Sequence, residues 1–553
     1  MAPDPRFRVQ RVATLALVTA ACALASYHDR ALPAPLGLDA PASAFSEARA
    51  AAFASSLDAP RLAGSDAEHA AFAKLERALR EVAAETRAAS AGRVVVDVLR
   101  TKHSGTFPLL GPGARETREQ TMAYDRLDAL AARVRVRGSI PNDTRGDSSH
   151  DAGEAPSSPP RSLLFAAHVD TVHVSPGGCD NAANVAVVLE TVRAFAAGLA
   201  ERRDYRDDDV TDVSTPGSKG THANASSLRE PDPRFFAPLM AMFVSAEEDG
   251  FMGASGVVRD HPWFKTQVAA FANFEAMGSG GPHRAFRATI GGSSSALLRL
   301  YSLGAPRPSG TVIAADVFSS GFIKSDTDFR VFRDDGDVPG IDLAFVEKTR
   351  LYHTPRDTVE ALVKHRPGSM QASGANALGF ARAFAERAAV FPSAEEKNET
   401  PPRLEVRPGG VSTTRPRDVR RGADETFPEH ERKPPLTVWF AFPGLGAFVL
   451  FDVDGAQMAA AVALAAVTST ALATFFPYGF GAPRAAEKED TATLLAAVVV
   501  GVAGAALAFA AAPVAGGLAA LATASVAKTP VPWSRSFGAF ALCVLPPAFA
   551  ASL

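Results

Sequence analysis

Residues 238–253, PLMAMFVSAEEDGFMG, combine a feature that predicts the fold with one that indicates chemistry. The apolar run from Pro238 to Ala246 predicts a buried β-strand, and it ends at two adjacent acids, Glu247 and Glu248. A third acid, Asp249, and a glycine follow them. Three carboxylates at the end of a buried strand indicate either a charged surface loop or a metal site. The remainder of the chain supplies the evidence that separates these alternatives.

Similar strands alternate with helices along the first two thirds of the chain. Buried strands are predicted at SLLFAA (162–167), QVAAFANFEA (267–276) and GIDLAFVE (340–347), and strong helices at 184–200 and 369–390. The shorter predictions are helices within 44–91 and 253–266 and strands at 92–101 and 133–138. Strands that alternate with helices predict an α/β fold, in which helices flank a mostly parallel mixed sheet.

Composition excludes some classes of protein and divides the chain into regions. The net charge of −3 over 553 residues gives no bulk basic character, so nucleic acid is not an expected partner. Two of the three cysteines, Cys22 and Cys543, lie in apolar runs, which argues against a disulfide framework. Residues 142–161 and 201–234 are polar and predict mobile insertions, and residues 392–435 predict a polar linker.

Both ends of the chain carry apolar segments that indicate a membrane. Residues 1–30 hold three arginines before a short apolar run, typical of a signal anchor or a signal peptide. Four nearly uncharged stretches follow the linker, at 436–451, 458–476, 493–526 and 537–553, and predict an all-α region of three to five spans over 436–553. The sequons at Asn142, Asn224 and Asn398 agree with a lumenal domain over residues 31–391, between these segments.

Candidate metal ligands follow the predicted strands. His168 and Asp170 are two residues apart, so in extended chain they point the same way, and the aspartate can orient the imidazole for a metal. Asp180 precedes a helix, where an acid is commonly an N-cap but can also be a ligand on a tight loop. Taken alone, each of these signals is weak, and a hydrogen-bonded histidine is the commoner explanation of the first.

The convergence of these residues is stronger evidence than any one of them. Glu275 ends another predicted strand, and His353 precedes a helix that Asp357 or Thr358 would cap. Ligands of open α/β sheets bind beyond the carboxyl ends of the strands, where His168, Glu248 and Glu275 all fall. Two histidines and three carboxylates suit Zn²⁺, and five ligands fit a pair of ions that share one carboxylate better than a single tetrahedral ion.

Five separated motifs then show a family resemblance. HVDTVHVSPGGCDNAANVAVVLE, VSAEEDGFMGA, HPWFKTQVAAFANFEAMGSGG, SDTDFRVFRD and YHTPRDT resemble the M28 family of zinc aminopeptidases, and most of all its membrane-bound endoplasmic reticulum metallopeptidase 1 type. The resemblance covers residues 44–390 and implies two zinc ions. It implies that His168 and Glu275 bind one ion and Glu248 and His353 the other, that Asp180 bridges them, that Glu247 is the general base and acid, and that Asp170 supports His168.

The resemblance also implies a function and has one departure. The family commonly has two adjacent aspartates where this chain has Asp180 and Asn181, so we expect somewhat reduced metal affinity. The expected protein is a membrane-anchored aminopeptidase that hydrolyses amino-terminal peptide bonds in the lumen of the endoplasmic reticulum, with peptide or protein amino termini as substrates and the lipid bilayer as a partner. The alternatives are a non-catalytic interaction subunit, which would lack several ligands, and a single-zinc glutaminyl-cyclase-like acyltransferase. The oligomeric state is not predicted.

Other polar residues are predicted to be structural. The four histidines without an acidic partner at motif spacing are His103, His173, His261 and His283. Asp326 and Asp328 are interpreted as acids that order a loop near the site, and Cys179 has no base beside it and is not expected to be a nucleophile. Asp249 has no predicted role beyond the loop.

Overall fold

A computed structural model describes residues 31–109, 120–137, 161–202, 236–289, 292–310, 325–387, 436–442 and 447–453, together with residues 315 and 318. The predicted signal segment, the linker, the apolar stretches after residue 453 and nearly all of both polar insertions therefore lie outside the described residues.

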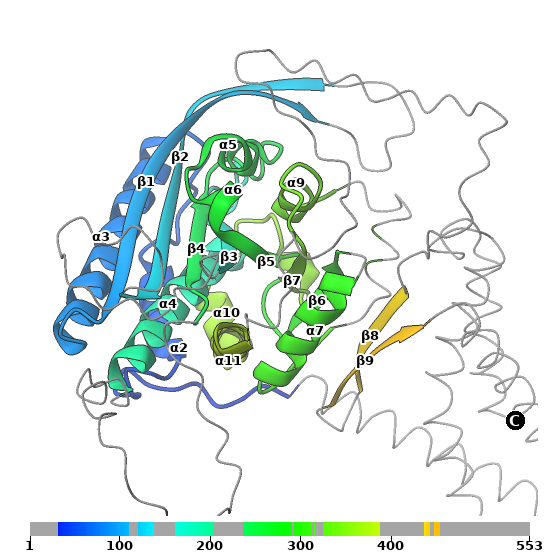
Figure 1. The fold of residues 1–553 in the computed structure, drawn as a ribbon. Helices are drawn as coiled ribbons and strands as arrows, with labels where there is room; N and C mark the ends of the chain where they lie inside the picture. Colours follow the sequence, from blue (N-terminus) through cyan, green and yellow to red (C-terminus); the bar gives the residue numbers. More distant parts are fainter. Residues whose placement is uncertain are drawn as a thin grey trace, which may run out of the picture.

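A seven-stranded mixed sheet forms the centre of the described chain (Figure 1). Its order is β1-β2-β4-β3-β5-β7-β6, and the four central strands β4, β3, β5 and β7 run parallel, whereas β1, β2 and β6 pair antiparallel at the two edges. The strands are β1 (Val94–Leu109), β2 (Gln120–Val136), β3 (Ser162–His168), β4 (Leu239–Val244), β5 (Val268–Ala276), β6 (His283–Ala288) and β7 (Gly340–Phe345). The predicted α/β sheet with a parallel centre is confirmed.

Helices cover both faces of this sheet. The larger core lies on the face that carries α2 (Glu47–Ser55), α3 (Asp66–Ala89), α4 (Asn184–Glu201), α7 (Gly292–Gly304), α10 (Val359–His365) and α11 (Ser369–Arg387). The smaller core lies under α5 (Met252–Asp260), α6 (Phe264–Gln267) and α9 (Asp328–Asp334). Along β3, Leu163 and Phe165 enter the larger core while Leu164 enters the smaller one. Burial on both faces explains why this strand is continuously apolar.

The helix after β3 is the most apolar of the described chain. The segment Gly178–Glu201 combines α4 with the preceding π-helical turn η1 (Gly178–Ala183). Within the described ranges, it is the one helix with the length and hydropathy to cross a membrane. However, 83% of its most apolar window is buried inside the protein, between the sheet and α11. Its apolarity therefore reflects a place in the larger core.

The two polar insertions both lie at the end of the sheet where the central strands β3 and β4 begin. One lies between the end of β2 at Val136 and the start of β3 at Ser162, and the other between the end of α4 at Glu201 and the start of β4 at Leu239. Because β3 and β4 are parallel and in register, both insertions join the sheet at the amino ends of these strands.

The structure differs from the sequence predictions in several elements. β2 begins 13 residues before the predicted strand, and β6, α7 and α9 were not predicted. The predicted all-α membrane region is wrong over its first stretch, where β8 (Leu436–Phe442) and β9 (Ala447–Val453) form an antiparallel pair. The physical reason is visible in the sequence, because PGLG separates two runs rich in aromatic and β-branched residues, which favours strands joined by a turn over a helix.

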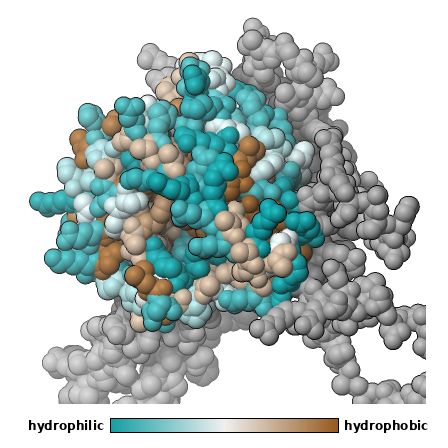
Figure 2. All heavy atoms as spheres, turned by 90° about the vertical axis from the view of Figure 1, so that its left-hand side faces the viewer, coloured by the Kyte–Doolittle hydropathy of each residue, from teal (hydrophilic) through white to brown (hydrophobic). Residues whose placement is uncertain are grey.

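The surface over α3 and β1 is the side of the molecule that Figure 2 shows. Most of it is hydrophilic, with hydrophobic residues scattered among polar ones. This agrees with α3, whose outward positions carry ion pairs such as Glu76 with Arg80 at 2.7 Å. A solvated helical face of this kind is ordinary for an outer layer and indicates no site.

Candidate metal centre

The predicted site residues meet at the carboxyl edge of the parallel strands. His168 is the last residue of β3, Glu275 is the penultimate residue of β5, and Glu247 and Glu248 follow the end of β4 by three and four residues. Asp180 comes from η1 and His353 from the loop before α10. Because β3 lies between β4 and β5 in the sheet, the strand ends bring these side chains together from five separate segments.

Two glycines allow the surrounding segments to approach closely. A Cβ atom on Gly253 would lie 2.0 Å from the Ser245 carbonyl oxygen, so only glycine lets α5 begin directly against the end of β4. A Cβ on Gly178 would lie 2.2 Å from the backbone of Thr358. The first contact closes the loop that carries Glu247 and Glu248, and the second seats the Asp180 turn against the start of α10.

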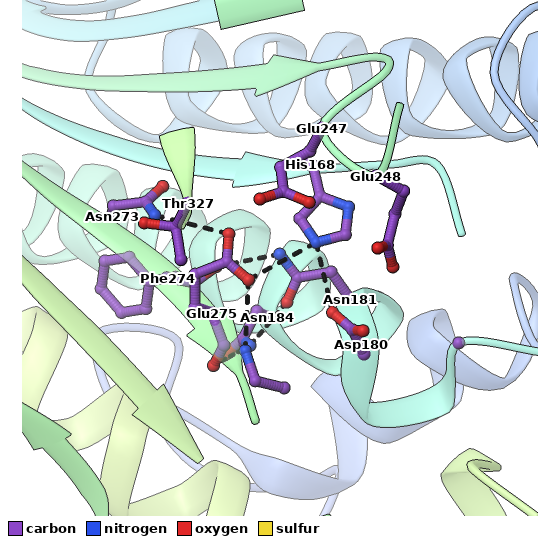
Figure 3. Close-up of polar contacts among 12 residues, drawn as sticks. His168, Asp180, Asn181, Asn184, Glu247, Glu248, Asn273, Phe274, Glu275 and Thr327 are labelled. Atoms are coloured by element: carbon purple, nitrogen blue, oxygen red, sulfur yellow. Dashed lines mark hydrogen bonds and ion pairs between the residues drawn. The ribbon is translucent and has the colours of Figure 1, made fainter. Parts of the chain in front are cut away.

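Asp180 lies at the centre of the arrangement, between the two histidines. Its Oδ1 is 3.2 Å from His168 Nε2, a contact drawn in Figure 3. Its Oδ2 is 3.0 Å from His353 Nε2. On one side, His168 Nε2 also lies 3.5 Å from Glu275 Oε2. On the other side, His353 Nε2 lies 3.2 Å from Glu248 Oε1. The five side chains thus form two groups that share one carboxylate.

The donor atoms of these groups fit divalent cations. His168, Asp180 and Glu275 offer ligand atoms within 4.8 Å of one another, and so do Asp180, Glu248 and His353. His168 Nε2, Glu248 Oε1 and His353 Nε2 are buried and have no hydrogen-bond partner of good geometry. Buried polar atoms without partners are costly, and convergent imidazole and carboxylate donors are a set that Zn²⁺ accepts.

Two further carboxylates hold the segments that carry the donors. Asp170, which is fully buried, accepts hydrogen bonds from the backbone N–H groups of Glu247 at 3.1 Å and Glu248 at 3.0 Å. His168 Nδ1, the ring nitrogen that faces away from Asp180, lies 3.1 Å from the backbone oxygen of Asp170 and 3.5 Å from its Oδ1. Asp170 thus contacts His168 through its backbone and its carboxylate, and its carboxylate also fixes the backbone of the two glutamates.

Asp357 holds the Asp180 turn in the same way. Its carboxylate accepts hydrogen bonds from the N–H groups of Cys179 at 3.0 Å and Asp180 at 3.1 Å, and the Gly178 N–H donates to its backbone oxygen. Of the two predicted helix caps, Thr358 is the N-cap of α10. Asp357 is thus a residue of the site. The sequence signal for it was its position four residues after His353, but an ordinary cap gives the same signal.

Charge interactions separate the pKa values of these groups. Burial opposes the charged form of both histidines, but the neighbouring carboxylates outweigh it, so the pKa of His168 is raised well above its usual value and the pKa of His353 is raised to about 10. Burial also opposes the charge of Asp180, yet the two histidines lower its pKa to about 2. Burial and then the charge of Asp180 raise the pKa of Glu248 to about 7.

Glu247 differs from Glu248 in its surroundings. It is buried beside His168 and belongs to a third group of close donors with His168 and Glu248 (Figure 3). Burial, and next the charge of Glu275, raise the pKa of Glu247 well above the usual range. A carboxylate with a raised pKa beside a cluster of potential metal ligands can accept a proton and return it.

Tyr352 was not singled out by the sequence. Its ring stacks on His353 with centroids 3.7 Å apart. Burial and the charges of Asp180, Glu248, Glu247 and Glu275 raise its pKa strongly, so its hydroxyl stays protonated and is available as a donor. The only sequence signal was adjacency to His353.

Asn181 occupies the departure from the family pattern and is well accommodated. Its Nδ2 donates to the Phe274 backbone oxygen at 2.9 Å, and its Oδ1 accepts from Asn184 Nδ2 at 2.6 Å. Asn184 also donates to the Glu275 backbone oxygen at 2.8 Å. An ionised aspartate at position 181 could not donate to Phe274. The expected effect of Asn181 on metal affinity stays a prediction.

Arg61 is a buried cation that sequence reasoning missed. Its guanidinium donates to the backbone oxygens of Val169 at 3.0 Å, Pro176 at 2.9 Å and Gly177 at 3.2 Å, and also to that of Leu57. It thereby ties the segment before α3 to the loop between His168 and Asp180. The contacts with Val169, Pro176 and Gly177 span more than one hundred residues of sequence, so no local pattern indicates them.

The remaining polar residues lie as follows. His103 and His261 are buried against each other at the α5–β1 contact, with ring centroids 6.2 Å apart. His173 is exposed. His283, the first residue of β6, is buried, and its Nδ1 lies 3.0 Å from Ser373 Oγ. In the part of the chain that the structure describes, none of these four belongs to a metal-binding group. Asp326 pairs with Arg287 at 2.6 Å, consistent with its predicted ordering role, and Cys179 is buried as a free thiol.

Comparisons with known proteins agree with this geometry. Residues 152–380 match the family model of peptidase family M28. The chain is 33% identical over 236 residues to endoplasmic reticulum metallopeptidase 1 of Mus musculus, and the alignment covers 43% of this chain and 22% of the relative. It is also 33% identical over 294 residues to endoplasmic reticulum metallopeptidase 1 of Homo sapiens, and that alignment covers 53% of this chain and 25% of the relative. The chain thus spans about a quarter or less of the length of these relatives.

A solved structure gives a weaker likeness. The aminopeptidase from Aneurinibacillus sp. strain AM-1 aligns with 61% of this chain and 93% of its own, at 13% identity and a TM-score of 0.36. A likeness at this level carries no functional argument. The family assignment rests on the sequence match, which includes His168, Asp180, the two glutamates, Glu275 and His353. Residues 152–380 of this chain belong to peptidase family M28.

Proposed function

We propose that the protein is a membrane-anchored metallopeptidase with two zinc ions, an aminopeptidase that hydrolyses amino-terminal peptide bonds in the lumen of the endoplasmic reticulum. One observation carries this proposal. The two oxygens of Asp180 face His168 Nε2 at 3.2 Å and His353 Nε2 at 3.0 Å, with a further carboxylate beside each histidine. A carboxylate shared between two half-sites suits a pair of close divalent ions, which is the arrangement of two-metal hydrolases.

The chain's own residues have defined tasks in this reaction. His168, Asp180 and Glu275 would hold one ion, and Asp180, Glu248 and His353 the other. Bound zinc supplies the polarisation of the scissile carbonyl and the acidification of a water molecule. Glu247 accepts the proton from that water and returns it to the leaving amine, which its raised pKa supports. Four backbone hydrogen bonds hold the ligand-bearing segments in pairs: Asp170 joins the end of β3 to the loop of Glu247 and Glu248, and Asp357 joins the segment of His353 to the Asp180 turn.

The setting of the reaction is supported by the relatives. Two of them are named for the endoplasmic reticulum, and a third, 33% identical over 195 residues, is a vacuolar membrane protease of Sclerotinia sclerotiorum. The apolar segments at 1–30 and after residue 453 would supply the membrane attachment and place the peptidase domain in the lumen. Peptide or protein amino termini are the proposed substrates.

The test uses the full chain in detergent and compares four proteins. Zinc content is measured by elemental analysis, and turnover is measured with a panel of aminoacyl fluorogenic substrates. Glu247→Gln is expected to keep two zinc ions and lose turnover, because it removes a proton acceptor and no ligand. His353→Ala is expected to lose the zinc ion of its own half-site. Asp249→Asn is the matched control, because Asp249 is the exposed neighbour in the same loop, and it should keep both properties.

Each alternative predicts a different pattern. A single-zinc acyltransferase would show one ion per chain and cyclise peptides with amino-terminal glutamine. An interaction subunit would show neither stoichiometric zinc nor turnover. Full activity in Glu247→Gln would contradict the assigned proton transfer, and a normal zinc content in His353→Ala would contradict the ligand set.

A further inference from the structure

A line of buried polar side chains runs away from the metal centre behind Glu275 (Figure 3). Asn273 precedes Glu275 by two residues on β5, so both side chains leave the same face of the strand. Asn273 Nδ2 lies 3.4 Å from Glu275 Oε1 and 3.1 Å from Asp342 Oδ1. Asn273 and Asp342 are both fully buried. One amide group therefore connects a candidate metal ligand to a second carboxylate.

Asp342 is itself fixed on its far side. Its Oδ2 accepts hydrogen bonds from Arg287 Nε at 3.0 Å, Arg287 Nη2 at 2.6 Å and Thr327 Oγ1 at 2.8 Å. Arg287 is buried and pairs also with Asp326 at 2.6 Å. Because these donors all converge on Oδ2, Oδ1 remains directed at Asn273. The position of Asp342 is thus determined independently of the metal centre.

The chemistry of the neighbours determines which way the amide of Asn273 points. Both atoms near Nδ2 are carboxylate oxygens, which accept hydrogen bonds when ionised. The reversed amide would place its oxygen against two carboxylate oxygens and lose both bonds. Asn273 Oδ1 has no partner among the described residues, so this orientation is kept although it leaves one buried acceptor unsatisfied. Neither aspartate nor leucine could donate to both neighbours.

We propose that Asn273 is a positioning residue that sets the rotation of the Glu275 carboxylate. With Oε1 held by Asn273, Oε2 is turned toward His168 Nε2, 3.5 Å away, and accepts the Ala276 N–H at 3.3 Å. Asn273 makes no contact with Glu248 or His353, so it acts on one half of the centre only. The inference rests on the proposed function, because it concerns the ion held by His168, Asp180 and Glu275.

The experiment measures zinc affinity directly. The full chain in detergent is stripped with a chelator and titrated with Zn²⁺ in competition with a chromogenic chelator. In Asn273→Leu, which keeps the volume and removes the donor, one of the two zinc affinities is expected to fall by about 10- to 100-fold, the usual effect of losing an outer partner of a ligand. The other affinity should change by less than about threefold.

A matched control separates positioning from folding. Asn376 on α11 is also a buried asparagine; it hydrogen-bonds the backbone N–H and oxygen of Arg307, and neither bond involves a candidate metal ligand. Asn376→Leu is expected to lower the melting temperature as much as Asn273→Leu or more, and to leave both zinc affinities unchanged. An equal loss of zinc in the two variants would overturn the proposal, because it would show a general effect of instability.

Single-ion backgrounds identify the affected half-site. His353→Ala retains the His168 half-site, and adding Asn273→Leu to it should weaken the remaining binding by the same roughly 10- to 100-fold. His168→Ala retains the His353 half-site, and the same addition should change little. The inference alone fails if the wild type binds two zinc ions and Asn273→Leu binds both with wild-type affinity. A wild-type chain that binds no zinc would overturn the proposed function and this inference together.

Discussion

Replacing Asp170 by asparagine tests how strongly one buried carboxylate organises the candidate metal centre. Asp170 accepts the N–H groups of Glu247 and Glu248 and lies beside His168 Nδ1. An asparagine of the same shape keeps one acceptor oxygen and turns an NH₂ group toward the second N–H. The substitution therefore loses one hydrogen bond to a charged group, worth about 1.5–3 kcal/mol, and leaves a buried donor unsatisfied at a cost of about 1–3 kcal/mol.

A second effect reduces this cost. The charge of Asp170 contributes, after burial, to raising the pKa of buried Glu68 to about 7, so removing that charge relieves some repulsion. We therefore expect a net loss near the lower end of the range, about 2–3 kcal/mol. For a domain of this size, that corresponds to a fall in melting temperature of roughly 5 °C. Zinc affinity should fall about 10- to 100-fold, because the loop of Glu247 and Glu248 loses one anchor and the carboxylate charge beside His168 Nδ1 is removed, although the Asp170 backbone oxygen still contacts that nitrogen.

The assay is thermal unfolding and competitive zinc titration of the full chain in detergent. Asp249→Asn serves as the control, because it removes the same charge from the exposed end of the same loop and should change stability by less than about 0.5 kcal/mol. If Asp170→Asn and Asp249→Asn behave alike in both measurements, the hydrogen bonds to Glu247 and Glu248 do not organise the site and the reasoning is refuted.

Three further predictions follow from the charges and contacts. The metal-free pKa values of His168 and His353 are raised, so both are protonated near neutral pH, and Glu248, with a pKa of about 7, is partly protonated. Zinc binding should therefore release two protons or more, and calorimetric heats that do not vary with the buffer's ionisation enthalpy would contradict this. Burial, and then His103, lowers the pKa of His261 to about 4 in the folded state. The unfolded state therefore binds a proton more readily, so the free energy of unfolding is unaffected by His261 above about pH 6.5 and declines as the pH falls toward 4. The loss at pH 4.5 is on the order of 2.5 kcal/mol, and denaturant titrations should show it reduced in His261→Gln. Tyr352→Phe should lower kcat on the order of 10²-fold with unchanged zinc content, and unaltered kcat would show that its hydroxyl does not act on the substrate.

The parts of the fold that the sequence predicts are those with a single dominant signal. β3, β4, β5 and β7 are short apolar runs because both of their faces are buried, and α4 is apolar for the same reason. β2 escapes prediction over most of its length because Leu127, Ala129 and Ala131 enter one core while Leu130 and Ala132 enter the other, and alanine-rich sequence of this kind also suits a helix. β6 is missed because two arginines interrupt it, one of which, Arg287, forms buried ion pairs with Asp326 and Asp342.

The candidate metal centre likewise has residues that the sequence predicts and residues that it does not. Its donors could be predicted because each follows a strand or precedes a helix, and parallel strands end at a common edge. The residues that support them depend on tertiary contacts. Arg61 meets its partners across more than one hundred residues, Asp357 meets Asp180 across 177, and Asn273 meets Asp342 across 69. Local spacing carries no information about such pairs, because an arginine or an asparagine has the same sequence context whether or not it is buried.

The placement of the two polar insertions has a practical consequence for anyone who handles this protein. Both join the sheet at the amino ends of β3 and β4, whereas His168 and Glu247 lie at or beyond the opposite ends of these strands. The length of each strand therefore separates the insertion points from the reacting groups. Epitope tags, fluorescent labels or engineered cleavage sites placed at these two junctions should report on the protein while leaving the candidate metal centre undisturbed.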